Sequence, residues 1–171
     1  MKKLILLSAV FMLAGCGFEP LYAQKESQGA WYSGSSYNTS IVNEMSQVKV
    51  EYIQDRFGQI VRNHLLDSLT PKGQPSNYKY RLIVIPEEPW VVLQALREDI
   101  TATREKARYW VKYMMLDTEG NELFNNDSVS YVSYDILANP YSTTVAAKKA
   151  EENAAKIIAD DITLRVGAYF H

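Results

Sequence analysis

Residues 105–121, EKARYWVKYMMLDTEGN, contain the most regular pattern in the chain. Up to Leu116, a set of apolar and tyrosine side chains alternates with a second set that includes the basic residues. This period of two predicts a half-buried strand that begins near Thr101. Alternation assigns one face to Ala107, Tyr109, Val111, Tyr113 and Met115, and the other face to Arg108, Trp110, Lys112 and Met114. Residues 117–121 form a turn that contains glycine, so the next strand, about 123–136, should return antiparallel.

Strand patterns also precede this hairpin. Residues 47–53 and 78–86 alternate apolar and polar side chains, which predicts two further strands. Residues 87–89, Glu-Glu-Pro, break the second of these, because proline cannot donate a hydrogen bond to a sheet. We interpret the apolar run 91–96 as a continuation of that strand after the break.

A first helix is predicted between these two strands. Asp55 is its expected N-cap, apolar residues at helical spacing continue to Leu69, and Pro71-Lys72-Gly73 ends it. Gly58 inside this helix costs about 1 kcal/mol relative to alanine. We interpret Gly58 as a site of close approach between the helix and the sheet.

A second helix follows the break at Asn139-Pro140. Its expected N-cap is Ser142 or Thr144, and an apolar stripe rich in alanine, which permits tight packing, extends to about Tyr169. Residues 47–171 therefore have the element order β-α-β-β-β-α. This order predicts an α+β fold, a two-layer sandwich in which a mostly antiparallel sheet of about four strands has two helices on one face.

The N-terminus has the organisation of a secretory signal peptide. Two lysines precede an apolar run over residues 4–13, so residues 1–15 are expected to be removed. The run is much shorter than the roughly 20 residues that a membrane-spanning helix needs. Leu13-Ala14-Gly15-Cys16 is similar to a bacterial lipobox, which makes Cys16 the expected site of lipid attachment. The alternative is an ordinary signal peptide with an incidental cysteine.

Residues 16–46 are expected to form a lipidated tether and an irregular arm. Serine, glycine, asparagine, glutamine and threonine dominate residues 27–40, which is the composition of a loop. Aromatic residues within it favour an arm that lies on a surface, and a flexible linker is the alternative. Gly17, rather than an aspartate, follows the cysteine, which by lipoprotein sorting rules favours the outer membrane.

Composition and motifs exclude several classes of function. A single cysteine excludes a disulfide framework and a CxxC-type zinc site. Without the two lysines of the signal peptide, 16 basic side chains remain against 20 acidic ones, a charge of −4 that argues against a nucleic-acid binder. His64 and His171 have no spaced catalytic partner, and common catalytic motifs do not occur. We therefore expect no enzymatic activity, and no cofactor beyond a covalent lipid on Cys16.

Several stretches resemble one known family. Residues 16–22, CGFEPLY, are similar to the CGFxPLY opening of the LptE-like lipopolysaccharide-assembly lipoproteins of proteobacteria. Residues 55–59, DRFGQ, resemble the start of a helix in that family, and the strand at 78–82, YKYRL, fits its order of elements. The resemblance extends over essentially the whole mature chain.

The resemblance implies a role in binding and assembly. Members of this family sit as a plug inside the large β-barrel LptD, assist its assembly and help to deliver lipopolysaccharide to the cell surface. The implied partners are an LptD-type barrel, lipopolysaccharide and the outer membrane, with no nucleic acid. The alternative is a lipoprotein binding module or an auxiliary subunit of another envelope lipid-transport system.

Basic residues between positions 97 and 112 are the candidate contacts to lipopolysaccharide. This segment has five positive and three negative charges, a net charge of +2. Arginine binds phosphate groups in a bidentate manner, which suits the phosphates of lipid A. The candidate lipopolysaccharide-binding residues are Arg97, Arg104, Lys106 and Arg108. The alternative is a charged hairpin whose ion pairs are internal.

Tyrosines in the predicted strands are the candidate contacts to the barrel. The chain has 12 tyrosines, and the candidates are Tyr78, Tyr80, Tyr109 and Tyr113. Tyrosine offers a large contact area with a polar tip, which suits a protein interface and the polar lumen of a membrane barrel. Ordinary packing within a sheet is the alternative, because strands favour aromatic residues.

Overall fold

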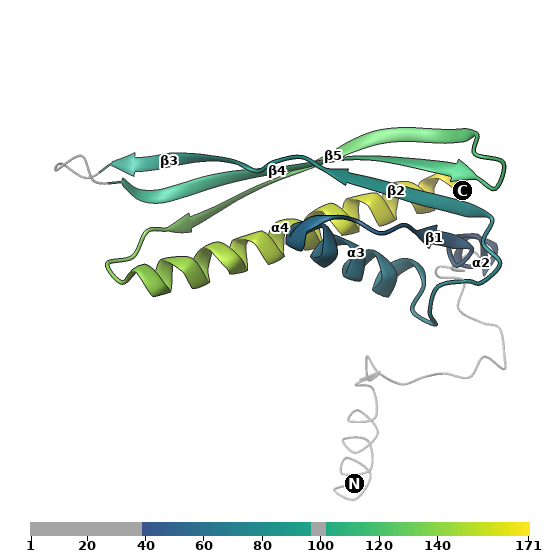
Figure 1. Ribbon diagram of the computed structural model, residues 1–171, viewed down its shortest axis with the longest axis horizontal. Coiled ribbons are helices and arrows are strands. Elements are labelled where there is room, and N and C mark those ends of the chain that lie inside the picture. The colour runs from purple at the N-terminus through teal and green to yellow at the C-terminus, as the bar shows by residue number, and fades with distance from the viewer. Residues whose placement is uncertain (1–38, 97–101) are drawn as a thin grey trace, which may run out of the picture. The chain divides into compact units, whose positions relative to one another are not determined.

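The computed structural model describes residues 39–96 and 102–171. The predictions for residues 1–38 and 97–101, which include Cys16 and Arg97, lie outside the described residues. The described elements, in chain order, are α2 (Thr39–Met45), β1 (Val48–Val50), α3 (Asp55–Leu69), β2 (Tyr80–Pro86), β3 (Trp90–Leu96), β4 (Ala102–Asp117), β5 (Glu122–Asp135) and α4 (Pro140–Tyr169) (Figure 1). None of these helices is long and apolar enough to cross a membrane.

Strand β4 is the centre of a five-stranded sheet (Figure 1). β5 pairs antiparallel with one edge of β4 along most of its length. The other edge of β4 pairs first with β3, over residues 102–108, and then with β2, over residues 111–117. β2 and β3 therefore lie end to end beside β4. The predicted break at residues 87–89 is confirmed. Because β2 and β3 are separate strands on its two sides, the sheet has five strands instead of the expected four.

Strand β1 adds one parallel pair to a sheet that is otherwise antiparallel. It runs beside β2, with Val48 opposite Tyr80 and Val50 opposite Leu82. Parallel neighbours need a crossover connection, and α3 lies in the connection between β1 and β2. The mostly antiparallel sheet of the prediction is therefore confirmed.

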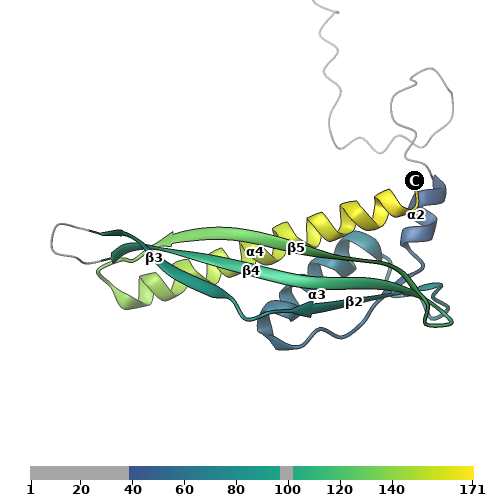
Figure 2. The same cartoon turned by 90° about the horizontal axis from the view of Figure 1, so that it is seen from above.

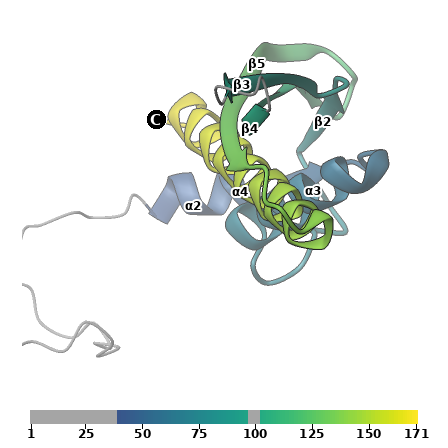
Figure 3. The same cartoon turned by 90° about the vertical axis from the view of Figure 1, so that its left-hand side faces the viewer.

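The two long helices cover the same face of the sheet, as predicted (Figure 2). Viewed from one end, α3 and α4 lie side by side below the curved sheet (Figure 3). Ala107, Val111, Tyr113 and Met115 of β4 are buried, which confirms the predicted inner face of this strand. The core between the layers is formed by residues from both helices and from β1, β2 and β4, including Val48, Val50, Val61, Leu65, Leu82, Val84, Val111, Met115, Ile158 and Ile162.

Helix α2 corrects the prediction that residues 16–46 are irregular. The segment Thr39–Met45 is helical although its β-branched residues have low helix propensity. Met45 packs against the core and faces α4, where a Cβ on Gly167 would lie 3.5 Å from the Met45 sulfur. Tertiary packing therefore supports this helix, and seven residues are too few to show a helical period in the sequence.

The start of α3 differs from the prediction by one residue. Gln54 is the N-cap and makes no side-chain capping bond, whereas Asp55 has a φ of +67°. Aspartate tolerates this left-handed region better than most residues. The Gln59 amide donates a hydrogen bond to the Ile53 carbonyl and braces the turn. Gly58 confirms the predicted close approach of this helix to the sheet, because a Cβ there would lie 3.3 Å from Pro86 Cγ at the end of β2 and would also meet Ile53, which precedes the helix.

The start of α4 also lies earlier than predicted. Asn139 is the N-cap, and its side-chain oxygen accepts a hydrogen bond from the Tyr141 backbone N–H at 3.0 Å. Pro140 occupies the first helical turn, where its missing N–H has no intrahelical role. Ser142 and Thr144, the expected caps, therefore lie inside the helix.

Candidate binding surface on the open sheet face

The predicted basic residues lie on the face of the sheet opposite α3 and α4, which we call the open face. Arg104, Lys106 and Arg108 occupy alternate positions of β4, so their side chains share this face. Arg104 lies between Gln94 of β3 and Asp135 of β5. Lys106 lies between Val92 and Ser133, and Arg108 lies between Trp90 and Tyr131. The structure therefore brings three of the four predicted residues together, and Arg97 lies outside the described residues.

A hollow of about 250 Å³ lies on this part of the open face. It is lined by Trp90, Val92, Gln94, Lys106, Arg108 and Tyr131. The side chains of Trp90 and Tyr131 are 59% and 56% exposed, so two aromatic rings border the hollow on the solvent side. Aromatic and cationic groups are therefore accessible next to each other.

Two cations of the open face are already paired with carboxylates. Arg104 Nε donates a hydrogen bond to Asp135 Oδ1 at 2.9 Å. Lys112 lies farther along β4, with its Nζ 2.7 Å from Glu87 Oε1. These contacts agree with the alternative of a hairpin with internal ion pairs. Exposed pairs of this kind contribute about 1 kcal/mol or less to stability.

Lys106 and Arg108 have no ion-pair partner within residues 39–96 and 102–171. Lys106 Nζ lies 4.9 Å from the centre of the Tyr131 ring, and the Arg108 guanidinium carbon lies 5.2 Å from the centre of the Trp110 ring. Arg108 Nε is also buried without a hydrogen-bond acceptor. Both groups can therefore offer charge-assisted hydrogen bonds to an added phosphate or carboxylate.

Two of the four predicted interface tyrosines point toward the helices. Tyr113 is 1% exposed and packs edge-on against Phe124, with ring centres 6.1 Å apart. Burial raises the pKa of its hydroxyl to about 12, and the hydroxyl has no hydrogen-bond partner. Tyr109 stacks on Phe57 at 4.6 Å, and its pKa is raised by burial and then by Glu151. Both residues therefore occupy positions that agree with the alternative interpretation, ordinary packing within the sheet.

The other two predicted interface tyrosines lie near α2. The Tyr80 hydroxyl donates a hydrogen bond to Glu44 Oε2 at 3.1 Å, and burial followed by this bond raises its pKa. Tyr78 precedes β2 instead of belonging to it, which corrects the predicted start of that strand. Lys49 Nζ lies 4.9 Å from the centre of the Tyr78 ring. The Tyr80 ring also packs on Phe170, with ring centres 5.0 Å apart, so this side chain lies on the helix side of the sheet.

Trp90 and Tyr131 were not among the site residues selected from the sequence. For Tyr131, the signal in the sequence was the register across the turn at 117–121. The register shifts by one residue between Met115 and Leu116, so a simple count from the turn places Tyr131 opposite Ala107 instead of Arg108. That count assigns Tyr131 to the wrong face of the sheet, because a slip of one residue reverses every side chain.

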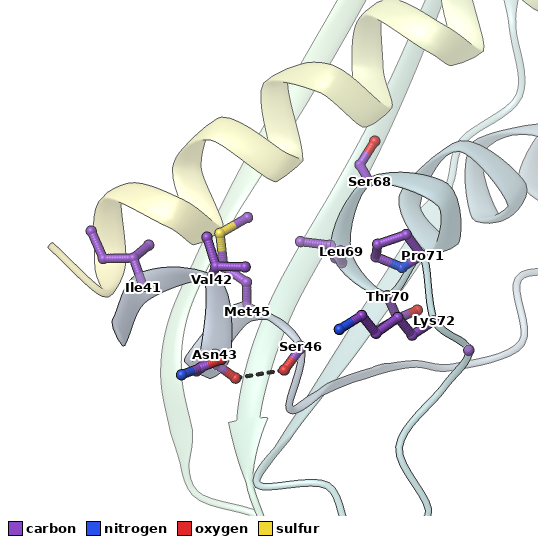
Figure 4. A pocket seen from close by; sticks show the side chains of 11 residues that line it. Ile41, Val42, Asn43, Met45, Ser46, Ser68, Leu69, Thr70, Pro71 and Lys72 are labelled. Atoms are coloured by element: carbon purple, nitrogen blue, oxygen red, sulfur yellow. Dashed lines mark hydrogen bonds between the residues drawn. The ribbon is translucent and has the colours of Figure 1, made fainter. Parts of the chain in front are cut away.

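A second hollow, of about 430 Å³, lies between α2 and the end of α3 (Figure 4). Ile41, Val42 and Met45 line it from α2, and Leu69 and Pro71 line it from the end of α3. This hollow is mainly apolar and contains none of the predicted site residues. Among the described residues, no group of three histidine, cysteine or acidic side chains is placed to hold a metal ion.

The chain matches one protein-family model and is similar in fold to several solved structures. A family model described as "LptE: Lipopolysaccharide-assembly" matches residues 45–166. No curated protein sequence matches the chain significantly.

Similar solved structures include a putative lipoprotein from Caulobacter crescentus, with a TM-score of 0.63, 23% identity, and 77% of this chain and 96% of that chain covered. A minor lipoprotein from Acinetobacter baumannii has a TM-score of 0.53 and 20% identity, covering 71% of this chain and 90% of its own. Rare lipoprotein B from Shewanella oneidensis has a TM-score of 0.56 and 11% identity, covering 71% and 93%. At these identities the similarity is one of fold.

Proposed function

This chain belongs to the LptE family of lipopolysaccharide-assembly proteins, and we propose that it is an outer-membrane lipoprotein that plugs an LptD-type β-barrel. In this role it assists assembly of the barrel and takes part in the transport of lipopolysaccharide to the cell surface. The observation that carries the proposal is the family match, because residues 45–166 include all five strands, α3 and most of α4.

The proposed attachment to the membrane is a lipid on Cys16. The lipobox-like residues 13–16 support it, and Cys16 is the only cysteine of the chain. Each buried CH₂ of an acyl chain contributes about 0.8 kcal/mol, and stable anchoring needs two lipid signals. A bacterial lipoprotein cysteine with two or three acyl chains meets this need without a membrane-spanning helix.

The polarity of the open face supports its placement inside a barrel. The lumen of an outer-membrane barrel is polar, so a plug should present hydrogen-bonding groups to it. The open face has the pairs Arg104–Asp135 and Lys112–Glu87, and Trp110 Nε1 donates to Asp127 at 3.0 Å. Tyr131 adds an exposed aromatic residue with a polar tip, the type enriched at protein interfaces.

The proposed lipopolysaccharide contact is the part of the open face around Lys106 and Arg108. These two cations have no carboxylate partner among the described residues, and they line a hollow beside two exposed aromatic rings. Arg104 is close in the same strand and can exchange Asp135 for a phosphate. Because the side chains of the mature protein sum to −4, an anionic lipid must be recognised by such a local group of cations.

A charge reversal tests this contact. We expect Arg104→Glu combined with Lys106→Glu to weaken the binding of purified lipopolysaccharide at least about tenfold, because charge-assisted hydrogen bonds contribute about 1.5–3 kcal/mol each. The measurement is a binding titration with wild-type and variant protein, with circular dichroism to verify the fold.

The matched control is Lys148→Glu combined with Lys156→Glu. It makes the same change in total charge on exposed positions of α4, away from the open face. We expect this control to bind lipopolysaccharide with nearly wild-type affinity. Equal affinities of the Arg104→Glu, Lys106→Glu protein and the wild type would contradict the proposed contact.

A further inference from the structure

Strand β3 has a free edge among the described residues. β4 pairs with one side of β3, and β1, which continues the sheet beside β2, does not extend along β3. On the side of β4 that faces β2 and β3, the Trp110 carbonyl accepts a hydrogen bond from the Glu87 N–H. On the side that faces β5, the Thr103 carbonyl accepts a hydrogen bond from the Ile136 N–H. Even-numbered residues of this part of β4 therefore direct their backbone groups toward β3.

The register identifies which backbone groups of β3 point outward. Trp90 and Val92 lie opposite even-numbered residues of β4, namely Arg108 and Lys106, so their backbone groups point inward to β4. Backbone groups alternate in direction along a strand, so those of Val91 and Leu93 point away from the sheet. An added strand can therefore pair with Val91 and Leu93 without disturbing the pairing of β3 with β4.

The side chains of β3 lack the usual protection of a free edge. Natural edge strands are commonly protected by charged residues, proline or a bulge, but the seven residues WVVLQAL have no charge and no proline. Val91 and Leu93 are 46% and 64% exposed on the helix side, and Trp90 is exposed on the other side. By contrast β5, the opposite edge strand, has acidic residues at positions 122, 127 and 135.

We propose that β3 is a self-association edge, where a second copy of this chain adds its own β3 in antiparallel orientation. A two-fold axis at Val92 places Val91 of one copy opposite Leu93 of the other, and these two outward-pointing residues exchange backbone hydrogen bonds. The two sheets then form one continuous sheet across the pair. The interface is isologous, because the same strand contributes both halves.

The composition of β3 favours a second copy as the occupant. An incoming strand must be apolar on the helix side, because β3 exposes Val91 and Leu93 there. β3 itself meets this requirement, and two uncharged strands meet without electrostatic repulsion. One strand pair is a small interface, so we expect a weak, reversible dimer. The proposed lipid anchor would raise the effective concentration of two copies on one membrane.

The oligomeric state of the mature chain in solution tests this inference. Cys16→Ala keeps the protein free of lipid and of an intermolecular disulfide, and sedimentation equilibrium follows its mass as the concentration rises. We expect a monomer–dimer equilibrium in this protein. Leu93→Lys should shift it to monomer by placing a cation against the apolar side chain of Val91 in the other copy, and Val91→Pro should do so by removing an outward N–H.

The matched control is Val129→Lys in β5, the other edge of the sheet. Val129 is 43% exposed and is also an apolar residue of an edge strand, so the chemical change is comparable. We expect this variant to dimerise like the parent protein, and circular dichroism verifies that all variants fold.

A second readout does not depend on weakening the strand. In the Cys16→Ala background, Val92→Cys should give a disulfide-linked dimer on mild oxidation, because the two-fold axis places residue 92 of one copy directly opposite residue 92 of the other, and Val129→Cys should not. The inference is overturned if the parent protein is monomeric at all concentrations, if Leu93→Lys still dimerises, or if only Val129→Lys becomes monomeric. A monomeric parent that binds a strand of another protein at β3 also overturns it. None of these outcomes bears on the proposed role in lipopolysaccharide assembly.

Discussion

Tyr113 is a single residue whose burial can be measured through its chemistry. Its hydroxyl lies in the core without a hydrogen-bond partner, and burial raises its pKa from 10.0 to about 12. The unfolded chain therefore loses this proton first, near pH 10, while the folded protein keeps it until about pH 12. The stabilisation is complete below about pH 10 and is lost as the pH rises through this window.

We predict that Tyr113→Phe makes stability less dependent on pH in this alkaline window. A shift of this size corresponds to at most about 3 kcal/mol, which the wild type loses and the variant retains. At neutral pH the variant should be as stable as the wild type or more stable by about 1 kcal/mol, because it removes an unsatisfied buried hydroxyl. Urea unfolding at a series of pH values measures both effects. Parallel losses in the two proteins would show that Tyr113 is not the titrating group.

Single residues also show what alternation in the sequence can establish. It placed Tyr113 and Met115 on one face of β4 and Arg108 on the other, and the structure confirms this, because a strand has no other period. It could not place Tyr131 beside Arg108. That neighbour depends on the register shift near Leu116, which no pattern in the sequence signals.

At the scale of elements, Gly58 sets the distance between α3 and the edge of the sheet. A Cβ at this position would meet Ile53, which is itself fully buried, and would lie 3.3 Å from Pro86 at the end of β2. We predict that Gly58→Ala lowers the free energy of unfolding by about 1–2 kcal/mol, because the cost of overpacking exceeds the gain in helix propensity.

Gly167→Ala in α4 is the matched control for this prediction. It makes the same change inside a helix, but the added Cβ would be 3.5 Å from Met45 Sδ, an ordinary contact. We expect it to be neutral or to stabilise the protein by up to about 1 kcal/mol through helix propensity. Thermal or urea unfolding of the two variants gives the comparison. Equal stability changes in the two variants would mean that the neighbours of Gly58 do not limit the size of the residue at position 58.

The elements that sequence could predict are those with enough residues to show a period. The two long helices and the strands β1, β2, β4 and β5 were predicted, and the break at residues 87–89 was recognised from its proline. Helix α2 was missed, because its seven residues are held by contacts of Met45 with the rest of the fold. The start of α3 was displaced, because its turn depends on Ile53 and Gln59 instead of a capping side chain.

At the scale of the whole described structure, residues 39–96 and 102–171, the order of elements was sufficient to predict the layers. Two helices that are apolar on one side and a sheet with one buried face can exclude water together only by packing face to face. This packing leaves the opposite face of the sheet open, and the basic residues of β4 lie there. Which partner meets this face is not contained in the pattern of apolar residues, because that pattern describes the core.

The partner is therefore the decisive question for the whole molecule. The most direct measurement is to tag the chain in its own bacterium, purify it from the outer membrane in mild detergent, and identify the co-purifying proteins by mass spectrometry. We predict that a large LptD-type β-barrel is recovered in equimolar amount with the lipidated chain. Recovery of the chain alone, or with subunits of another lipid-transport system and no such barrel, would contradict the proposed function.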